Sequence, residues 1–513
     1  MEYYDDTGPA VLRLDWRRGA GPRGAIPGTA WKDGVEVAYY QLDSSRIPPL
    51  HALVPETVSS VGSLDVPFSW GTFAGSGRSQ HVGAVYEGLI VVPADDVYSF
   101  ELTSEDGSRL TIDDRLVVDN DGVHNRTSAS GGIALRAGAH RARVEYFLRE
   151  QGCALSLKVW TATMAKQTVP SSWWKRAPMV HVPTTYPTLS AAIAAAASGS
   201  TVWVAPGWYT GAGNRNLDLD GKRIHVVAGG GPALTILDAQ GLGRVFHLVD
   251  HTQGEASIEG FTLTGGHAAS GAGGAMLLEG STLFLRDCRI QGNTSAGNGG
   301  AISLRGASNP VFENCLIAGN AAGAAGGGID VAAGARPSFV GCTVSGNRAG
   351  TSGGGANIVG GGTLTFDRTI LWGNSAGTEG LEAWTGDAGS TVQLSCSAMI
   401  SGGLGGNGSE LYGVGNLFTN PRFCAPAAAS QAPTKGGGYR VAATSPVLSS
   451  SCGARIGALG EGCAVMVTAV EEGPLADSPT RGVALRQNVP NPFNPSTRIP
   501  FVLGKSETVS LRV

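Results

Sequence analysis

The sequence predicts an all-β protein in which an antiparallel β-sandwich is followed by a parallel β-helix and part of an immunoglobulin-like module. Three observations support this. Glycine makes up 78 of 513 residues, about double the usual ~7%, yet 42% of residues are apolar and no collagen triplet is present, which indicates tight turns in a packed β protein. Short alternating apolar segments are separated by Gly, Asp and Asn turns. From residue 288 the sequence repeats every 27 residues.

Charge and hydropathy exclude two classes of partner. The formal net charge is −4, and the Lys and Arg residues are scattered along the chain. Nucleic acid and anionic membranes attract clusters of positive charge, so neither is expected. No apolar stretch approaches the roughly 20 residues of a membrane-spanning helix, so no membrane span is expected.

The start of the chain repeats a later part. A shift of 143 residues aligns the first 32 residues without a gap, so that Glu2 falls on Glu145 and Trp31 on Trp174. We interpret residues 1–33 as the end of a first sandwich whose complete sibling follows at residues 34–178. The visible sequence is then interpreted as a fragment, so the absence of a signal peptide does not indicate where the protein is located.

Residues 34–178 carry the motifs "VYSFELTSEDGSRLTIDD", "LRAG" and "VEYF...LSLKVW". Their alternating strands and polar turns describe an antiparallel sandwich. In these motifs the segment resembles the protective-antigen-type (PA-fourteen) sandwich domain found in bacterial glycosidases, toxins and yeast flocculins.

This resemblance implies a candidate site. In sugar-binding members of the family, two consecutive acidic residues after the "YSF" strand hold a calcium ion that contacts sugar hydroxyls, and here these are Glu105 and Asp106. A hard cation needs several oxygen ligands, which Asp106, Asp121 and Asn125 on neighbouring loops could supply. The alternative is that Asp106 and Gly107 only form a hairpin turn.

The 27-residue repeat predicts one coil of a parallel β-helix per repeat, because coils of this kind bury their apolar faces by stacking. Equivalent positions form columns in the stack. Two columns are expected inside, namely Ile290, Ile317, Val344 and Leu371, and Leu285, Phe312, Phe339 and Phe366. An Asn column is expected to adopt a left-handed turn and to bond along the stack, namely Asn293, Asn320, Asn347 and Asn374.

Seven of the eight cysteines fall into two groups. Cys288, Cys315 and Cys342 share a column whose spacing is not that of a zinc site, so they are expected to be small buried residues. Four others lie in or next to an irregular region where a secreted protein could form disulfides, namely Cys396, Cys424, Cys452 and Cys463. The sequence leaves their pairing open, although Cys452 with Cys463 is geometrically easy.

The segment "YPTLSAAIAAAASGSTVWVAPGWYTG" precedes the coils and resembles the entry to pectate-lyase-like right-handed β-helices. The β-helix is therefore assigned to residues 179–465, with a short helix at 189–197 covering the open end of the stack.

Catalysis on the β-helix would need clustered carboxylates in an exposed groove. The outward columns alternate acids and bases with inert residues, and Asp330 lies alone between Ser303 and Asn357, which indicates a solvated face. Four histidines in the first coils are expected to be satisfied surface or turn residues, namely His225, His247, His251 and His267. No catalytic residue is assigned.

The C-terminal region reads as a linker at residues 466–482 and a module at residues 483–513. The stretch from Leu485 through Thr497 resembles the C-terminal sorting domain of bacterial type IX secretion. That resemblance implies the type IX machinery as a partner and a secreted or outer-membrane surface location in a Gram-negative bacterium.

Together these features predict a secreted or cell-surface, adhesin-like protein that displays glycan-binding sandwiches on a β-helix, with calcium as a possible cofactor. The main alternative is a polysaccharide lyase or glycoside hydrolase acting through the β-helix groove. A third hypothesis is that the protein is a structural stalk that binds no ligand.

Overall fold

The computed structural model describes residues 31–463, apart from residues 49, 51–52, 54, 114, 151, 177–178, 252–255 and 453–454, together with residues 484–485 and 501–502. The chain divides into two compact units, Met1–Cys463 and Ala464–Val513. Most of the remnant predicted at residues 1–33 lies outside the described residues. In the second unit the structure describes one antiparallel pair, β46 (Ala484–Leu485) with β47 (Phe501–Val502), and the rest of the linker and sorting module lies outside the description.

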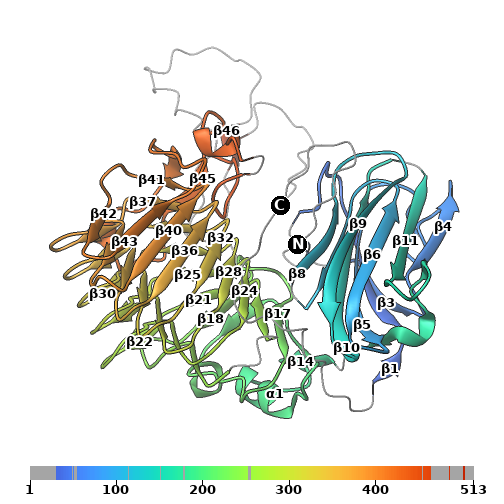
Figure 1. The fold of residues 1–513 in the computed structure, drawn as a ribbon, viewed down its shortest axis with the longest axis horizontal. Coiled ribbons are helices and arrows are strands. Elements are labelled where there is room, and N and C mark those ends of the chain that lie inside the picture. The colour runs from blue at the N-terminus through green and yellow to red at the C-terminus, as the bar shows by residue number, and fades with distance from the viewer. Residues whose placement is uncertain are drawn as a thin grey trace. The chain divides into compact units, whose positions relative to one another are not determined.

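The first part of the larger unit is the predicted antiparallel sandwich, shown from blue to teal in Figure 1. One sheet contains β1 (Lys32–Asp33), β13 (Trp174–Arg176), β5 (Val82–Val92), β10 (Gly138–Leu148), β7 (Ser108–Ile112) and β8 (Arg115–Asn120), with β2 (Val35–Gln41) on β5 and β3 (Thr57–Val61) on β2. The other contains β12 (Gln167–Thr168), β11 (Cys153–Trp160), β6 (Asp96–Ser104) and β9 (Thr127–Leu135), with β4 (Asp65–Ser69) on β11. Large aromatic side chains such as Tyr86, Phe100 and Trp174 fill the core between them.

The second part is a parallel β-solenoid built from four sheets (Figure 1). The longest sheet contains β14 (Met179–Val182), β15 (Thr201–Val204), β17 (His225–Ala228), β20 (Ser257–Glu259), β24 (Phe284–Arg286), β28 (Val311–Glu313), β32 (Ser338–Val340), β36 (Thr363–Asp367), β40 (Thr391–Ser395) and β43 (Ser409–Tyr412). The second contains β16 (Gly207–Tyr209), β18 (Thr235–Asp238), β21 (Thr262–Thr264), β25 (Arg289–Gln291), β29 (Leu316–Ala318), β33 (Thr343–Ser345), β37 (Ile370–Trp372) and β41 (Ala398–Met399).

The two remaining sheets close each coil. One contains β19 (Phe246–Val249), β23 (Met276–Glu279), β27 (Ile302–Arg305), β31 (Ile329–Val331), β35 (Ala356–Ile358), β39 (Ala383–Thr385) and β42 (Leu404–Gly406). The other contains β22 (His267–Ala268), β26 (Thr294–Ser295), β30 (Ala321–Ala322), β34 (Arg348–Ala349) and β38 (Ser375–Ala376). The predicted capping helix is present as α1 (Leu189–Ala195) and buries Leu189 and Ile193 against the first coil. Within the described residues, no helix is long and apolar enough to cross a membrane.

The interior columns are confirmed. All eight predicted interior residues are fully buried, and the rings of Phe312 and Phe339 stack with centroids 4.4 Å apart. The column cysteines Cys288, Cys315 and Cys342 are buried free thiols, as expected. Stacking succeeds because strand partners lie one repeat apart, as in the pairing of Ile290 with Ile317.

The Asn column forms a continuous buried ladder, with one correction to the prediction. Asn320 Oδ1 accepts hydrogen bonds from the backbone N–H and the side-chain amide of Asn293, and Asn320 in turn donates to Asn347 Oδ1. The left-handed backbone conformation, however, belongs to the glycine before each Asn, such as Gly319 with φ 62°. The glycine makes the turn and the Asn ties the coils together.

Glu382, which the sequence analysis did not single out, ends this ladder. Its carboxylate accepts hydrogen bonds from the side-chain amide of Asn374 at 2.6 Å and from the backbone N–H of Gly373 at 2.8 Å. The residue is 1% exposed, and burial raises the pKa of its carboxyl to about 7, whereas the hydrogen bonds from Asn374 and Gly373 lower the pKa.

This pKa makes stability depend on pH. A carboxyl whose pKa is higher in the folded than in the unfolded state binds its proton more tightly when folded, so stability falls as pH rises from about 4.5 to about 7. We expect Glu382 to contribute a loss of about 3 kcal/mol across this range. Glu382→Gln cannot ionise but keeps only one of the two acceptor oxygens, so its stability relative to the wild type should be higher at pH 8 than at pH 4.5 by about 3 kcal/mol. Urea unfolding at both pH values measures the difference. A constant difference would contradict the assignment.

A C-terminal segment, residues 417–463 apart from 453–454, returns along the outer face of the β16 sheet, and we call it the strap. It contains the short pair β44 (Phe423–Ala425) and β45 (Gly438–Val441). The strap packs Val441, Val447 and Ile456 on Ile370 and Ala398, while Tyr439 and Ala458 cover Leu316 and Ala318. Backbone hydrogen bonds join Thr434 to Gly319 and Gly457 to Arg368, so this face of the solenoid is covered by the chain itself.

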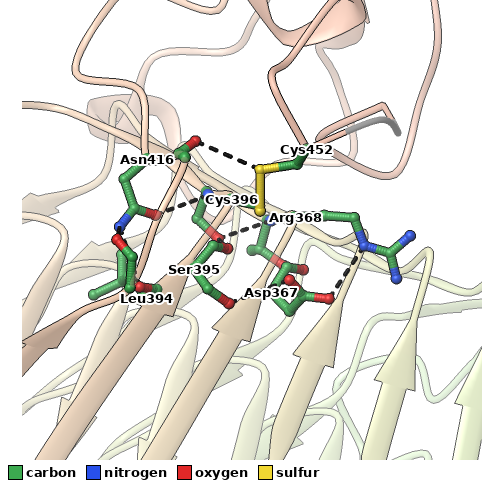
Figure 2. The surroundings of a disulfide bond; sticks show 11 residues. Asp367, Arg368, Leu394, Ser395, Cys396, Asn416 and Cys452 are labelled. Carbon is green, nitrogen blue, oxygen red and sulfur yellow. Dashed lines mark hydrogen bonds and ion pairs between the residues drawn. A yellow bond between two sulfur atoms is a disulfide. The ribbon is translucent and has the colours of Figure 1, made fainter. Parts of the chain in front are cut away.

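Two disulfides stabilise this region, of which Cys396–Cys452 fastens the strap to the solenoid and Cys424–Cys463 closes a loop within the strap. Cys396 pairs with Cys452, and Cys424 with Cys463, so the geometrically easy pair of Cys452 with Cys463 does not form. Figure 2 shows Cys396 directly after the end of β40, where it meets Cys452 of the strap. Asn416 lies beside this bond and accepts a hydrogen bond from the backbone of Ser397. Cys452 and Cys463 are close in sequence, but Cys452 pairs with Cys396 at the end of β40, whereas Cys463 pairs with Cys424 inside the strap.

Candidate functional site

Four loops meet at one end of the sandwich, which we call the loop end. Strand pairing explains why they meet. Ser104, at the end of β6, pairs with Thr127 on β9 and Leu155 on β11, and Ser69, at the end of β4, pairs with Cys153. The segments at residues 69–71, 105–107, 121–126 and 149–150, together with Gly152, therefore share this end, which contains all four predicted site residues.

Asp106 organises the loop end. It is 6% exposed and has φ 56°, so it forms the turn after β6 that the alternative interpretation predicts. Its carboxylate also joins two other loops, because Oδ1 accepts from the backbone N–H of His124 at 3.2 Å and Oδ2 from that of Arg149 at 2.8 Å. Gly107 must lack a side chain, since a β-carbon there would lie 2.4 Å from the ring of Phe147.

Asp121 is held in a different way. Its side chain is 3% exposed, and its carboxylate accepts from the backbone N–H of Ile47 at 2.8 Å and from Arg109 Nη2 at 2.8 Å. Asn125 is exposed on the same loop, and Glu105 is half-buried next to Asp106. The structure thus brings Asp106 close to the loop that carries Asn125, whereas Asp121 faces a guanidinium.

As they lie, these residues leave few carboxylate oxygens free for a calcium ion. A cation at Asp121 would displace Arg109 from the same carboxylate, and both oxygens of Asp106 already accept backbone hydrogen bonds. Within the described part of the chain, no group of three or more His, Cys, Asp or Glu residues is arranged to hold a metal ion. Calcium binding through Glu105 and Asp106 stays a prediction.

The loop end also carries exposed aromatic residues that the sequence analysis missed. Phe68 is 41% exposed and Trp70 is 70% exposed, and their rings meet edge to face with centroids 5.2 Å apart. The guanidinium of Arg126, next to Asn125, lies 5.3 Å from the centroid of the Phe68 ring. The sequence signal was present in "DVPFSW", because two aromatic residues two positions apart lie on one face when the chain is extended.

On the solenoid, charged side chains converge at one place, against the sandwich. Glu259 lies 2.8 Å from Arg143 of the sandwich and 3.5 Å from His225. His225 is 2% exposed, and burial followed by the positive charge of Arg141 lowers its pKa well below the usual value. The cavity among these residues measures about 10 Å³, which is room for no more than one water molecule. The cluster is a packed contact and excludes a sugar.

Two predictions for the solenoid surface need correction. His225 and His251 are both buried, so neither is a surface histidine. Asp330 is fully buried rather than solvated, and its carboxylate accepts hydrogen bonds from Ser303 and Asn357, one coil to either side. Burial, the largest influence, raises the pKa of Asp330. Polar columns on a solenoid can thus lie inside the coil.

Two family models match separate parts of the chain. Residues 31–172 match the PA14 domain, and residues 250–393 match the family described as right handed beta helix region. These matches agree with the sandwich and with the right-handed solenoid predicted from sequence. A search of curated proteins found no match.

Among solved structures, similar chains include an anti-sigma factor domain-containing protein from Clostridium clariflavum, with 21% identity over 31% of this chain and 51% of that one and a TM-score of 0.25. Others are the PA14 domain of the MpAFP antifreeze protein, with 13% identity over 30% and 96% and a TM-score of 0.26, and the PA14 sugar-binding domain from an RTX adhesin, with 14% identity over 28% and 99% and a TM-score of 0.26. The chain spans about half the length of the anti-sigma factor domain-containing proteins it matches.

Proposed function

We propose that the sandwich binds carbohydrate through its loop end and that the solenoid is a rigid carrier, in an adhesin-like protein. The main support for this proposal is the arrangement of the loops at the loop end. A sandwich that matches the PA14 domain gathers four loops there, and the buried carboxylate of Asp106 joins three of them. Loops held by a rigid scaffold are the usual place for binding residues.

The two disulfides support the proposal that the protein is located outside the cytoplasm. Cys396–Cys452 joins the strap to the solenoid and Cys424–Cys463 lies within the strap, and such bonds persist in oxidising compartments. The sorting-domain resemblance of residues 485–497 adds the finer proposal that the type IX machinery exports the protein to the surface of a Gram-negative bacterium.

The test is a glycan array probed with the full chain, once with calcium and once with EDTA. Selective binding to a group of related glycans supports the proposal, and its loss in EDTA would support the calcium prediction as well. Absence of binding in both conditions contradicts the proposal. If incubation with polysaccharides instead releases unsaturated or reducing ends, the alternative of an enzyme acting through the β-helix gains support.

We expect Asp106→Ala to weaken glycan binding at least tenfold, because the loops at His124 and Arg149 lose their common acceptor. The matched control is Asp95→Ala. Asp95 also accepts a loop amide, from Ala137, but it precedes β6 and so lies at the opposite end of the sandwich. The measurement is the dissociation constant of each variant for the glycan that the wild type binds most tightly on the array. Equal affinities would show that the acidic loop is not part of the binding site.

A further inference from the structure

We propose that Trp70, held by Phe68, Arg126 and Gly152, is the platform on which a pyranose ring stacks at the loop end. This inference rests on the proposed carbohydrate binding and names the surface and the part of the sugar that it contacts.

Strand β4, which ends directly before Trp70, contains an irregularity that turns Phe68 and Trp70 outward. On β11, Cys153 and Leu155 are two residues apart, but their partners on β4, Ser69 and Val66, are three apart. One extra residue therefore lies in β4. A bulge of this kind reverses which face the following side chains occupy, and bulges are common where a functional side chain must be re-aimed.

Without the extra residue, Phe68 would lie on the face of Val66, which packs against the sandwich core. With it, Ser69 takes the place opposite the buried Cys153, and its two neighbours, Phe68 and Trp70, point outward together. Burial of Phe68 would be worth about 1.5–3 kcal/mol. A fold that exposes this ring next to a second exposed aromatic residue forgoes that stabilisation.

Three contacts hold the platform in place. Phe68 meets Trp70 edge to face, with ring planes at 83°, and Arg126 covers the Phe68 ring. Gly152 provides the floor, because a β-carbon there would lie 3.3 Å from the indole and 3.5 Å from the Phe68 ring. Gly152 lies against one side of the indole, so this contact explains why that side is covered. The contact does not explain why Trp70 is still 70% exposed to solvent.

The size and surroundings of the platform fit a sugar better than a protein. Even fully covered, two aromatic side chains offer no more than about 500 Å², well below the ~800 Å² that each partner buries in a stable protein complex. The rim is polar, with Asn125 and Arg149 exposed and Glu105 half-buried. A pyranose combines an apolar C–H face with hydroxyl groups at its edge, so it could stack on the indole while its hydroxyls reach these side chains.

The experiment compares full-length wild type, Trp70→Ala and Trp208→Ala. Trp208 is an equally suitable exposed tryptophan, 62% exposed, but it lies on β16 of the solenoid. The probes are methyl β-galactopyranoside, methyl β-glucopyranoside and methyl α-mannopyranoside in saturation-transfer NMR, together with the glycan array. We expect at least tenfold weaker binding by Trp70→Ala, less than a twofold change for Trp208→Ala, and saturation of the sugar C–H protons that disappears with Trp70.

The outcomes separate this inference from the proposed function. If the wild type binds no glycan in either assay, carbohydrate binding is wrong and the platform with it. If the wild type binds and Trp70→Ala binds equally well, only the platform is wrong. Should Trp70→Ala unfold, Trp70→Phe keeps an aromatic ring at the position. It is expected to retain measurable binding with weaker saturation transfer, and an unchanged affinity and transfer pattern would overturn the role of the indole.

Discussion

Asn320→Ala is expected to lower the free energy of unfolding by about 3–5 kcal/mol, since several buried polar groups lose their partners at once. The backbone N–H and the side-chain amide of Asn293 both donate to Asn320 Oδ1, each at 3.0 Å. The side-chain amide of Asn320 also donates to the carbonyl oxygens of Ile290 and Ala318 and to Asn347 Oδ1. None of these groups is reached by solvent in the folded coil, because Asn293, Asn320 and Asn347 are all fully buried.

The matched control is Asn309→Ala. Asn309 is an exposed Asn close to the same coil, and its side chain donates only to the carbonyl of Ala307. We expect this change to stay within about 0.5 kcal/mol. Urea unfolding followed by far-ultraviolet circular dichroism gives both values. Similar midpoints for the two variants would mean that the ladder adds little to the stacking of the coils.

Loss of the Cys396–Cys452 disulfide is expected to cost about 4 kcal/mol. The bond links residues 56 positions apart, and closing a loop of this length restricts the unfolded chain by that amount in the chain-entropy account. The double variant Cys396→Ala/Cys452→Ala tests this by its unfolding midpoint. The strap residues that cover Ile370 and Ala398 should then become sensitive to limited proteolysis.

Reduction provides the control. Dithiothreitol should destabilise the wild type by more than it destabilises the double variant, which retains only Cys424–Cys463. The column thiols Cys288, Cys315 and Cys342 are already free, so they are not expected to contribute to the difference. An equal response of both proteins to the reductant would contradict the assigned stabilisation.

The solenoid shows how far sequence reasoning extends in this protein. Its interior columns, its Asn ladder and its capping helix were all predicted from a 27-residue spacing and a short Ala-rich segment. That succeeds because each coil contacts mainly its two neighbours, so a residue meets the same environment one repeat later. Beyond the last regular repeat, the spacing no longer predicts which residues meet. Glu382 replaces an Asn as the last acceptor of the ladder, and no periodic signal announces it.

The candidate site was predicted only in part. The motif placed Glu105, Asp106, Asp121 and Asn125 near one another, and all four do lie at the loop end. It did not show that Arg109 would form an ion pair with the carboxylate of Asp121, since the partner of a buried carboxylate depends on side chains from separate strands. The outward direction of Phe68 and Trp70 depends on one extra residue in β4, which alternation alone cannot locate.

The sequence by itself therefore determined the all-β class, the sandwich, the coil period and the residues that fill the coil. These follow from local alternation and from repetition, which every part of the chain carries in its own residues. Only the tertiary structure decided the disulfide pairing, the strap over the β16 sheet, the burial of Asp330 and His225, and the exposed aromatic pair. All of these except Asp330 depend on two segments distant in sequence meeting at one point, and that meeting is set by the packing of the whole domain. Asp330 meets Ser303 and Asn357 one repeat away, and the repeat spacing alone does not show whether such a column lies inside or outside the coil.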